Sequence, residues 1–487
     1  LLLLVTAFLP FSNGLKFLCY SPRFASSHVN FMGKLTDSLI SAGHEVVVLS
    51  PTLDPTVKIG SAKARLIEIP QTDDQFEIGM NENVTAWQLG ATWEIIGDWS
   101  SFAPLWLAQC RAEQFDAAFT ETIDWCSVGI FYLTGIDRFA VTESFAHKDG
   151  VYQFSQTESN LAYVPTIMGG HFGEEMTLAQ RTYNVFNYFV YKWYVYHAVD
   201  GYNKIFDEFH PGFPDVAELM SRNSLYFLNS DPLVDFPRPS TARVIDIGGI
   251  AISNGPKKLN TTWSSILDLR RHTVLLSFGT LAKTHSMPEE YKETIRATAR
   301  AMPDVTFIWK YEKPEHNVTQ GVANLIESTW VPQNDLLHDK RLSLFVTHCG
   351  QGSTTEANYA GVPVMVVPVI LDQVRNAYAM KRAGVGLIVE KSQLASIDPF
   401  RSSIKQVLDD PRSVLYRIVS GQCVSKLRYN SLQIFVRNME FLAMHGPLRM
   451  LDHHGRNLTF VQYYLIDVIS LISCSFVFIC ASIVAIV

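Results

Sequence analysis

The sequence predicts an α/β protein with two facing Rossmann-like domains and one C-terminal transmembrane helix. Two series of short apolar strands and helical runs follow one another along the 487 residues, separated by a linker-like stretch at residues 250–260. Within each series, polar residues gather where strands end, which is where open parallel sheets bind ligands. Residues 468–487 carry no charge, and their length suits one membrane-spanning helix.

The chain divides into five segments on this basis. Residues 1–14 are typical of the apolar core and small-residue end of a secretory signal peptide, although no initiator methionine or basic start precedes them. We assign the rest to an N-terminal domain (15–250), a C-terminal domain (251–445), a juxtamembrane segment (446–462) and the transmembrane helix (463–487). The two ends together imply a luminal body with a single anchor.

The composition is that of a globular chain with a membrane contribution. Charged residues make up 18% of the chain and apolar residues 47%. The net charge of −7 and the pI of about 6.1 argue against nucleic-acid binding. Four Asn-x-Ser/Thr triplets agree with luminal exposure and begin at Asn83, Asn260, Asn317 and Asn457.

The seven cysteines show no spacing typical of a metal site or a disulfide framework. Two of them lie in the predicted anchor, which leaves the odd number of five, and we expect most of these to be buried thiols. A luminal compartment permits one disulfide, such as Cys110 with Cys126, but the sequence does not select it.

The first strand–helix series opens with a predicted strand at residues 15–20. A helix follows at about 29–42, because its apolar positions keep to one face, and Gly43 ends it. Further strands are predicted at 46–49 and 117–120. No glycine fingerprint follows the first strand, so a dinucleotide site is not supported.

Two stretches of the first domain are rich in aromatic residues. Residues 75–110 contain several Trp and lack a strand pattern, which indicates helices. Residues 176–210 contain eight aromatic residues between Tyr183 and Tyr196. We favour a helix packed in a core for this second stretch. The alternatives are an apolar acceptor pocket or a membrane-facing patch.

The second series contains predicted strands at 273–278, 305–309 and 342–346. The third strand stops at a polar turn, residues 347–353, before a helical run that Gly361 and Pro363 end. A further apolar run at 364–371 stops at Asp372 and Gln373. This strand–helix–strand unit gathers its polar residues at the strand ends.

The polar turn has two interpretations. Ser353 and Glu356 fit the spacing of a capping box, so both side chains could cap the helix. The same helix start suits a phosphate, because free backbone N–H groups and a partial positive charge lie there. Gly350 and Gly352 would let the backbone approach the ligand, and His348 could donate to a phosphate oxygen.

The residues that flank this unit suit a base and a sugar. The indole of Trp330 can stack on a flat base and the amide of Gln333 can pair with its edge, although a lone Trp is more often a core residue. Asp372 and Gln373 offer acceptors and donors of the kind that sugar hydroxyls need, although an Asp after a strand is usually a loop residue.

The combined spacing W-x-x-Q, H-C-G-x-G-S-x-x-E and P-x-x-x-x-P-x-x-x-D-Q resembles the signature of UDP-glycosyltransferases, most closely the membrane-bound animal UDP-glucuronosyltransferase-like branch. The resemblance implies a GT-B fold, with the donor in the C-terminal domain and the acceptor mostly in the N-terminal one. It implies that Trp330 stacks on uracil and Gln333 contacts the uridine. The other implied donor contacts are His348 and Ser353 to the diphosphate, Glu356 to the ribose, and Asp372 with Gln373 to the transferred sugar. Gly279 and Thr280 match a family loop near the donor phosphates, and an ordinary turn between a strand and a helix is the equal alternative.

The resemblance also points to the catalytic residues. A positioned His removes the proton of an attacking hydroxyl well, and His28 matches the family base. Family members carry an Asp that supports this base, whereas the chain has Glu121 in that place. Glu121 is one methylene longer and could still reach His28. Asp124 is the fallback, and Asp116 is interpreted as structural.

The expected reaction is a one-step displacement with inversion at the anomeric carbon, in which UDP leaves. It needs no cofactor and no metal, with the UDP-sugar as co-substrate. The donor is UDP-glucuronate or UDP-glucose, and Arg375 is a candidate partner of a glucuronate carboxylate. The expected acceptor is a small lipophilic molecule, and the expected location is the endoplasmic reticulum membrane, with a homo-oligomer allowed. The alternative is a catalytically silent UDP-sugar-binding or partner-binding protein on the same fold.

Overall fold

The computed structural model describes residues 14–70, 109–146, 154, 157, 160–167, 169–252, 255–280, 282–410 and 431–486. The chain forms two compact units, Leu1–Pro447 and Leu448–Val487, which are described separately here. Three predictions fall on residues outside the described part of the chain. They are the signal peptide at 1–14, the helices over most of 75–110 and the glycosylation triplet at Asn83.

The first unit contains a parallel sheet of seven strands in the order β3-β2-β1-β4-β5-β6-β7. The predicted first strands are confirmed with small shifts of their ends, and β4 continues to Glu121. The strands are β1 (Lys16–Tyr20), β2 (Glu45–Pro51), β3 (Arg65–Ile69), β4 (Ala117–Glu121), β5 (Phe139–Glu143), β6 (Leu225–Leu228) and β7 (Val244–Asp246). All of these pairs are parallel, so their carboxyl ends meet at one edge.

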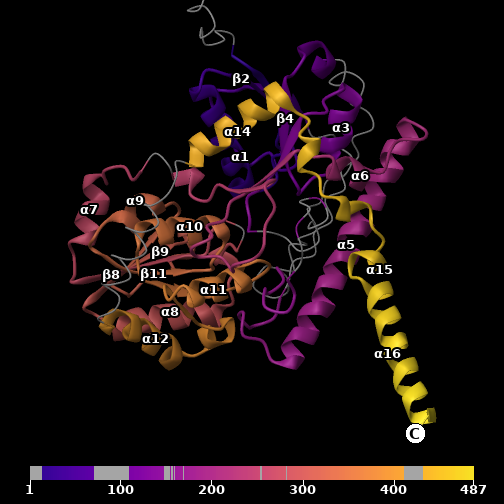
Figure 1. Cartoon of the computed structure of the whole chain (residues 1–487). Coiled ribbons are helices and arrows are strands. Elements are labelled where there is room, and N and C mark those ends of the chain that lie inside the picture. The colour runs from indigo at the N-terminus through magenta and orange to yellow at the C-terminus, as the bar shows by residue number, and fades with distance from the viewer. Residues whose placement is uncertain are drawn as a thin grey trace, which may run out of the picture. The chain divides into compact units, whose positions relative to one another are not determined.

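Helices cover both faces of this sheet (Figure 1). One face buries an apolar core under α3 (Cys126–Thr134), α6 (Val216–Ser221) and part of α5 (Leu178–Phe209). On the other face, α1 (Ser26–Ser41) contacts α14 (Ser431–His445). Although α14 is late in the sequence, its Phe435 ring packs edge-on against Phe119 of β4 and Phe227 of β6. The chain therefore returns to the first sheet after building the second.

A second parallel sheet of six strands has the order β10-β9-β8-β11-β12-β13. Its strands are β8 (His272–Ser277), β9 (Val305–Lys310), β10 (Leu325–Ser328), β11 (Leu342–Thr347), β12 (Val364–Val366) and β13 (Gly386–Ile388). The strand β12 is shorter than the predicted run of 364–371, because the chain turns where Gln373 accepts from the backbone of Val369 and Ile370.

Alternating side chains of the second sheet pack into two hydrophobic cores, one on each face. Val274 and Leu276 of β8 face one core and Leu275 faces the other, as the period of a strand requires. The first core includes α8 (Glu289–Ala301) and α12 (Ile397–Asp409). The second includes α9 (Gln333–His338), α10 (Gln351–Ala360) and α11 (Gln373–Arg382). In Figure 1, α9 and α10 lie on one side of these strands and α8 and α12 on the other.

Each sheet reverses its strand order at one place, and these places mark the two candidate ligand sites. In the first sheet the reversal lies between β1 and β4, and in the second between β8 and β11. At such switch points the connections leave in opposite directions and open a crevice at the carboxyl ends of the strands. His28 follows β1 and Glu121 ends β4, whereas Gly279 follows β8 and His348 follows β11.

The favoured interpretation of residues 176–210 is half right. They form a helix, α5, but its buried residues are only Asn184, Val195, Val199 and Tyr202. The aromatic residues of its N-terminal half are largely exposed, including Phe186 at 61% and Trp193 at 67%. The expectation that this half packs in a core is therefore wrong.

The described cysteines of the two domains are buried free thiols, as expected: Cys19, Cys110, Cys126 and Cys349. The pairing of Cys110 with Cys126 is not formed. Burial raises the pKa of Cys110 to about 11, so this thiol stays protonated and unreactive at neutral pH.

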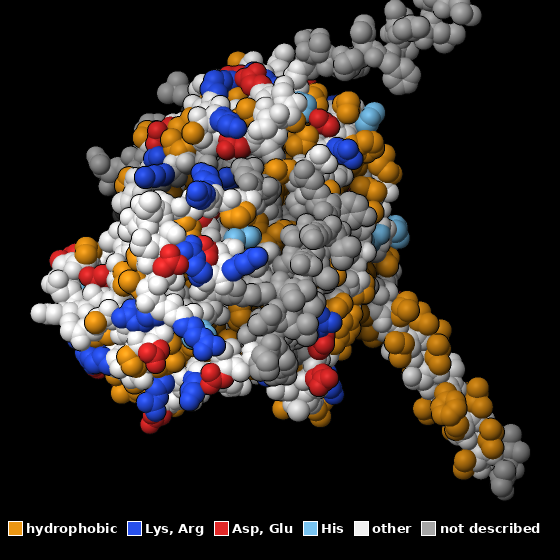
Figure 2. Space-filling model, turned by 90° about the vertical axis from the view of Figure 1, so that its left-hand side faces the viewer, with side chains coloured by type: hydrophobic (Ala, Val, Ile, Leu, Met, Phe, Trp, Pro, Cys, Tyr) orange, Lys and Arg blue, Asp and Glu red, His pale blue; other side chains and the backbone are white. Residues whose placement is uncertain are grey.

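The second unit contains the apolar C-terminal run. It forms α15 (Phe460–Tyr463) and α16 (Ile466–Ile486). The residues Ile466–Ala485 are long and apolar enough to cross a membrane, on length and composition alone. Hydrophobic side chains dominate this helix in the space-filling view (Figure 2).

Candidate active site

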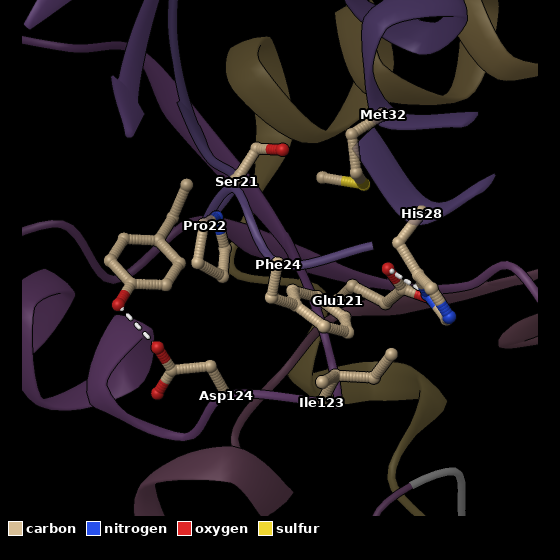
Figure 3. Close-up of a pocket in the computed structure, with 9 residues that line it drawn as sticks. Ser21, Pro22, Phe24, His28, Met32, Glu121, Ile123 and Asp124 are labelled. Carbon is tan, nitrogen blue, oxygen red and sulfur yellow. Dashed lines mark hydrogen bonds and ion pairs between the residues drawn. The ribbon is translucent and has the colours of Figure 1, made fainter. Parts of the chain in front are cut away.

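His28 and Glu121 meet at the switch point of the first sheet (Figure 3). His28 is the third residue of α1, and Glu121 is the last residue of β4. The imidazole Nδ1 lies 2.9 Å from Glu121 Oε1 and 3.0 Å from Oε2. Both side chains are buried, with 9% and 6% of their surface exposed. The extra methylene of Glu121, relative to the Asp of the family pattern, does not prevent this contact.

Ser144 completes the surroundings of the His28 ring. Its backbone N–H donates to Glu121 Oε1 at 2.9 Å, and its Oγ lies 2.8 Å from His28 Nδ1. An ionised carboxylate only accepts hydrogen bonds, so we assign the ring proton to Nδ1. The lone pair is then on Nε2, on the opposite side of the ring. This is the tautomer that a general base needs.

His28 lines a small pocket that is partly open to solvent. Its apolar walls come from Phe24, Met32 and Ile123. The ring of Phe24 lies 5.0 Å from the His28 ring, and that of Phe145 lies 4.8 Å from it in an edge-on arrangement. The base therefore stands at the wall of an apolar pocket.

Asp124 does not serve as the fallback partner of His28. Its Oδ2 accepts from the hydroxyl of Tyr20 at 2.6 Å, and its Oδ1 accepts from the N–H of Cys126 at the start of α3. Burial raises the pKa of Asp124, and its hydrogen-bond donors only partly oppose this. Asp116 is structural, as predicted, because its Oδ2 accepts from the backbone of Lys16 at 2.7 Å.

His348 lies at the switch point of the second sheet, between two glycines. A Cβ added to Gly279 or to Gly350 would come within 2.6 Å of the His348 ring. Gly279 also has φ of +78°, a conformation that favours glycine. Burial, aided by the nearby charge of Lys310, lowers the pKa of His348 to about 4, so the ring is neutral at neutral pH. Thr280 follows Gly279 and is exposed.

The helix α10 starts earlier than a capping box would require. It begins at Gln351 after Gly350, and no described side chain caps it. Ser353 is therefore the third helical residue, and the capping-box interpretation of Ser353 and Glu356 is wrong. The first-turn N–H groups, which include that of Gly352, have no helical partner. A phosphate is a suitable partner for such groups.

Glu356, Gln333 and Ser353 form a hydrogen-bonded cluster that joins α9 and α10. Gln333 Nε2 donates to Glu356 Oε2 at 2.7 Å and to Ser353 Oγ at 3.2 Å. Burial raises the pKa of Glu356 to about 7, and the bond from Gln333 opposes the shift. A carboxylate with so few donors can accept from ligand hydroxyls. Trp330, shortly before this cluster, is 69% exposed and is not a core residue.

Asp372 and Gln373 are both buried beside the start of α11. Asp372 Oδ2 accepts from Asn376 Nδ2 at 2.7 Å. Gln373 Oε1 accepts from two backbone N–H groups, those of Val369 and Ile370, so its amide is held in one orientation. This arrangement leaves the Nε2 end of Gln373 as the group that can donate to a ligand.

Arg375 is not placed to bind a glucuronate carboxylate. Its Nη1 donates to Asp235 Oδ1 at 2.6 Å, its Nε donates to the carbonyl of Pro165, and its side chain is only 2% exposed. Burial alone would raise the pKa of Asp235, but Arg375 and Arg238 hold it well below its ordinary value. The guanidinium is thus part of a buried ion pair.

Sequence reasoning missed Ser144, Lys310 and Asp235. Ser144 follows β5 directly, and Lys310 ends β9, so both lie at the carboxyl edges of their sheets. Lys310 Nζ donates to the carbonyl of Gly279 in the loop beside His348. For Lys310 the available signal was its position directly after the predicted strand at 305–309, whereas no strand was predicted before Ser144. No comparable signal identified Asp235.

The family model described as UDP-glucoronosyl and UDP-glucosyl transferase matches residues 18–487. The chain belongs to this UDP-glycosyltransferase family. Among its relatives is the Caenorhabditis briggsae protein named "Putative UDP-glucuronosyltransferase ugt-47", which is 25% identical over 93% of this chain and 88% of its own length. UDP-glucosyltransferase 2 of Dactylopius coccus is 25% identical over 99% of this chain and 94% of its own.

Solved structures show that this glycosyltransferase has the GT-B fold. The spinosyn forosaminyltransferase SpnP superposes with a TM-score of 0.60 at 17% identity, over 88% of this chain and all of that chain. Phytolacca americana UGT2, complexed with UDP-2fluoro-glucose and pterostilbene, superposes with a TM-score of 0.58 at 16% identity over the same shares. The predicted fold class and the predicted enzyme class are both confirmed.

Proposed function

We propose that this UDP-glycosyltransferase moves a glucosyl or glucuronosyl group from a UDP-sugar to a hydroxyl of a small lipophilic acceptor, with inversion and with His28 as general base. The observation that carries the proposal is the contact of His28 Nδ1 with Glu121 and Ser144, which leaves the lone pair on Nε2. The His28 side chain is one of the residues that line a pocket with apolar walls from Phe24 and Met32.

The reaction is a single displacement. The acceptor hydroxyl gives its proton to His28 Nε2 as its oxygen forms a bond to the anomeric carbon of the sugar. The bond from that carbon to the diphosphate breaks, and UDP leaves from the opposite face. Glu121 stabilises the imidazolium, because its carboxylate already contacts Nδ1.

The donor half of the proposal assigns each part of the UDP-sugar to residues at the second switch point. The diphosphate meets the first turn of α10, with His348 and Ser353 beside it, where the helix dipole stabilises the departing charge. Gly279, Thr280, Gly350 and Gly352 line its approach. Trp330 stacks on uracil, Gln333 contacts the uridine, and Glu356 accepts from the ribose. Asp372 and the Nε2 end of Gln373 contact the transferred sugar.

A His28→Ala variant tests the proposal against the alternative of a silent UDP-sugar-binding protein. We expect turnover of a phenol panel to fall by about 10²- to 10⁴-fold, which is the usual contribution of a general base. UDP affinity, measured by calorimetry, should stay unchanged. His210→Ala, at the exposed end of α5, is the matched control and should keep full turnover. Equal turnover of the two variants would remove His28 from the mechanism.

The choice of donor is tested by assaying the purified protein with UDP-glucose and UDP-glucuronate. Because Arg375 is committed to Asp235, it offers no support for glucuronate. An Arg375→Lys variant tests this residue directly. If the variant loses transfer from UDP-glucuronate but keeps transfer from UDP-glucose, Arg375 would again be the candidate partner of a glucuronate carboxylate.

We also propose that α16 anchors the protein in the endoplasmic reticulum membrane with the catalytic body in the lumen. The length and apolar composition of Ile466–Ala485 support the anchor. The acceptor triplets at Asn260, Asn317 and Asn457 are exposed, which agrees with glycosylation in that compartment.

A further inference from the structure

We propose that the N-terminal half of α5 is a membrane-docking face that lies in the interface of the bilayer that α16 enters. The face consists of Leu178, Phe186, Phe189, Val190 and Trp193. From Phe186 onward these residues follow the i, i+3, i+4, i+7 spacing that brings side chains to one side of a helix. The proposal rests on the anchor proposed for α16 and is independent of the reaction assigned to His28.

The docking face is exposed to a degree that the fold of the first unit does not explain. Its residues are 73%, 61%, 52%, 46% and 67% exposed, in chain order. The opposite side of the same helix supplies Val195, Val199 and Tyr202 to the core of the first sheet. The helix is therefore fixed in place by one side, and presents large apolar side chains on the other over about 22 Å of its length.

The charges along α5 favour a lipid surface as the partner. Between Leu178 and Val199 the chain contains Arg181 and Lys192 and no acidic residue. The acidic residues Asp200, Asp207 and Glu208 all lie in the last third of the helix. By helical spacing the two cations lie on the flank of α5, roughly 100–130° round the helix from the docking face, and cations on the flank of a helix in the interface are attracted to anionic lipid headgroups.

The residue types on this half of α5 are those of a membrane interface. Trp and Tyr are enriched there, because each has an apolar body and a polar tip. Lys192 Nζ lies 5.9 Å from the ring centres of both Tyr188 and Tyr196, so its charged end is next to two aromatic rings. A lysine in this position can carry its charge to the headgroups while its stem stays in an apolar layer.

The anchor places a bilayer within reach of the docking face. Residues 448–465 join the first unit to α16, and this length of chain spans at most about 60 Å when extended. The tether holds the first unit at a high local concentration beside the membrane. A helix with only a modest affinity for the interface is then sufficient to dock.

Photo-crosslinking in the full-length protein tests the docking face. The residues Phe186, Phe189 and Trp193 are replaced one at a time by p-benzoylphenylalanine, and each protein is reconstituted into phosphatidylcholine vesicles with or without phosphatidylserine. A probe at Lys204 is the matched control, because Lys204 lies on the same side of α5 three turns beyond Trp193 and is also exposed. A probe at Phe478 in α16 reports the anchor itself. UDP binding by each variant verifies that it is folded.

We expect lipid adducts from the probes at 186, 189 and 193, several-fold more abundant than from the probe at 204, and a further increase with phosphatidylserine. Crosslinks that double the protein mass would instead identify a second copy as the partner, and crosslinks to residues 448–486 would identify the chain's own C-terminal unit. Either result, or lipid adducts at 478 alone, overturns the proposal. If the probe at 478 also fails to label lipid, the anchor is wrong and the docking face falls with it, while the His28 assays remain unaffected.

Discussion

At the scale of single residues, the proposed catalytic site depends on the carboxylate of Glu121, which holds the His28 ring in one orientation. Glu121 reaches His28 because it is the last residue of β4, at the carboxyl edge of the sheet and next to the first turn of α1. Ser144 adds a backbone N–H to the same carboxylate from the neighbouring strand end. The longer side chain is therefore accommodated by the edge of the sheet, where three chain segments converge.

Replacing Glu121 with Gln tests whether this carboxylate fixes the tautomer. The amide would hold the ring less firmly and could present its NH₂ to Nδ1, which would place the proton on Nε2. We expect turnover to fall by about 10²- to 10⁴-fold while UDP affinity is unchanged. Glu121→Asp, which shortens the side chain to the family residue, should retain more turnover than the Gln variant. Steady-state kinetics with calorimetric UDP binding decide this, and equal losses in both variants would contradict it.

At the scale of elements, two of the glycines assigned to the donor site, Gly279 and Gly352, serve different purposes. The Cβ of an alanine at 279 would strike the His348 ring, and the backbone there has positive φ. An added Cβ at Gly352, in the first turn of α10, meets no atom of the chain within 4 Å. The first glycine is required by the fold of the loop. The second leaves room in front of the helix start.

These two positions give opposite predictions for stability and binding. Gly279→Ala should lower the free energy of unfolding by about 1–3 kcal/mol, because it forces strain into a tight loop. Gly352→Ala should leave stability unchanged or raise it by up to about 1 kcal/mol, since alanine favours the helix. It should nevertheless weaken UDP binding, because its methyl group occupies the approach of the phosphate. Chemical denaturation and calorimetry measure both quantities. Unchanged UDP affinity in the Gly352 variant would contradict the assigned phosphate site.

The buried ion pair of Arg375 with Asp235 joins α11 to the chain that follows β6. Both side chains are buried, so removing one partner leaves a charge without compensation. We expect Asp235→Asn to lower the free energy of unfolding by about 3–5 kcal/mol. The folded-state pKa of Asp235 lies below the unfolded value, so the stability it contributes is present above that unfolded value and is lost as the pH falls. Denaturation midpoints measured as the pH is lowered from neutral should therefore fall less in the variant than in the parent protein.

At the scale of the whole chain, the strands could be predicted from sequence, whereas contacts between distant segments could not. Periodicity located β1, β4, β8 and β11, and the parallel topology then brings His28 to Glu121 and Gly279 to His348. The ion pair of Arg375 with Asp235 was not predictable, because the two residues are 140 positions apart in sequence and only the tertiary fold brings them together. The exposure of α5 was also hidden, since apolar composition is the same for a core helix and for an exposed one.

Helix α10, which packs on the second sheet, is hydrogen-bonded to loops of the first sheet. Gln351 Nε2 donates to the carbonyl of Asn229 after β6, and Tyr359 donates to the carbonyl of Gly248 after β7. Ser431, the first residue of α14, donates to the same Gly248 carbonyl. The helix whose N-terminus is assigned to the diphosphate is thus held at both ends by segments that belong to the first sheet.

The anchor makes a prediction about the whole molecule. Replacing Leu471 and Phe478 of α16 with Lys puts two charges into the only described helix that could span a membrane. Each charge near the bilayer centre costs roughly 2.5–3.5 kcal/mol on insertion, so the helix should no longer be retained. Alkaline carbonate extraction should leave the parent protein in the membrane pellet and release the variant. The control is the single substitution Asp207→Lys at an exposed position of α5, which changes the net charge by the same amount as the two lysines in α16. This control should stay in the pellet. A parent protein that carbonate releases would show that α16 does not span the bilayer.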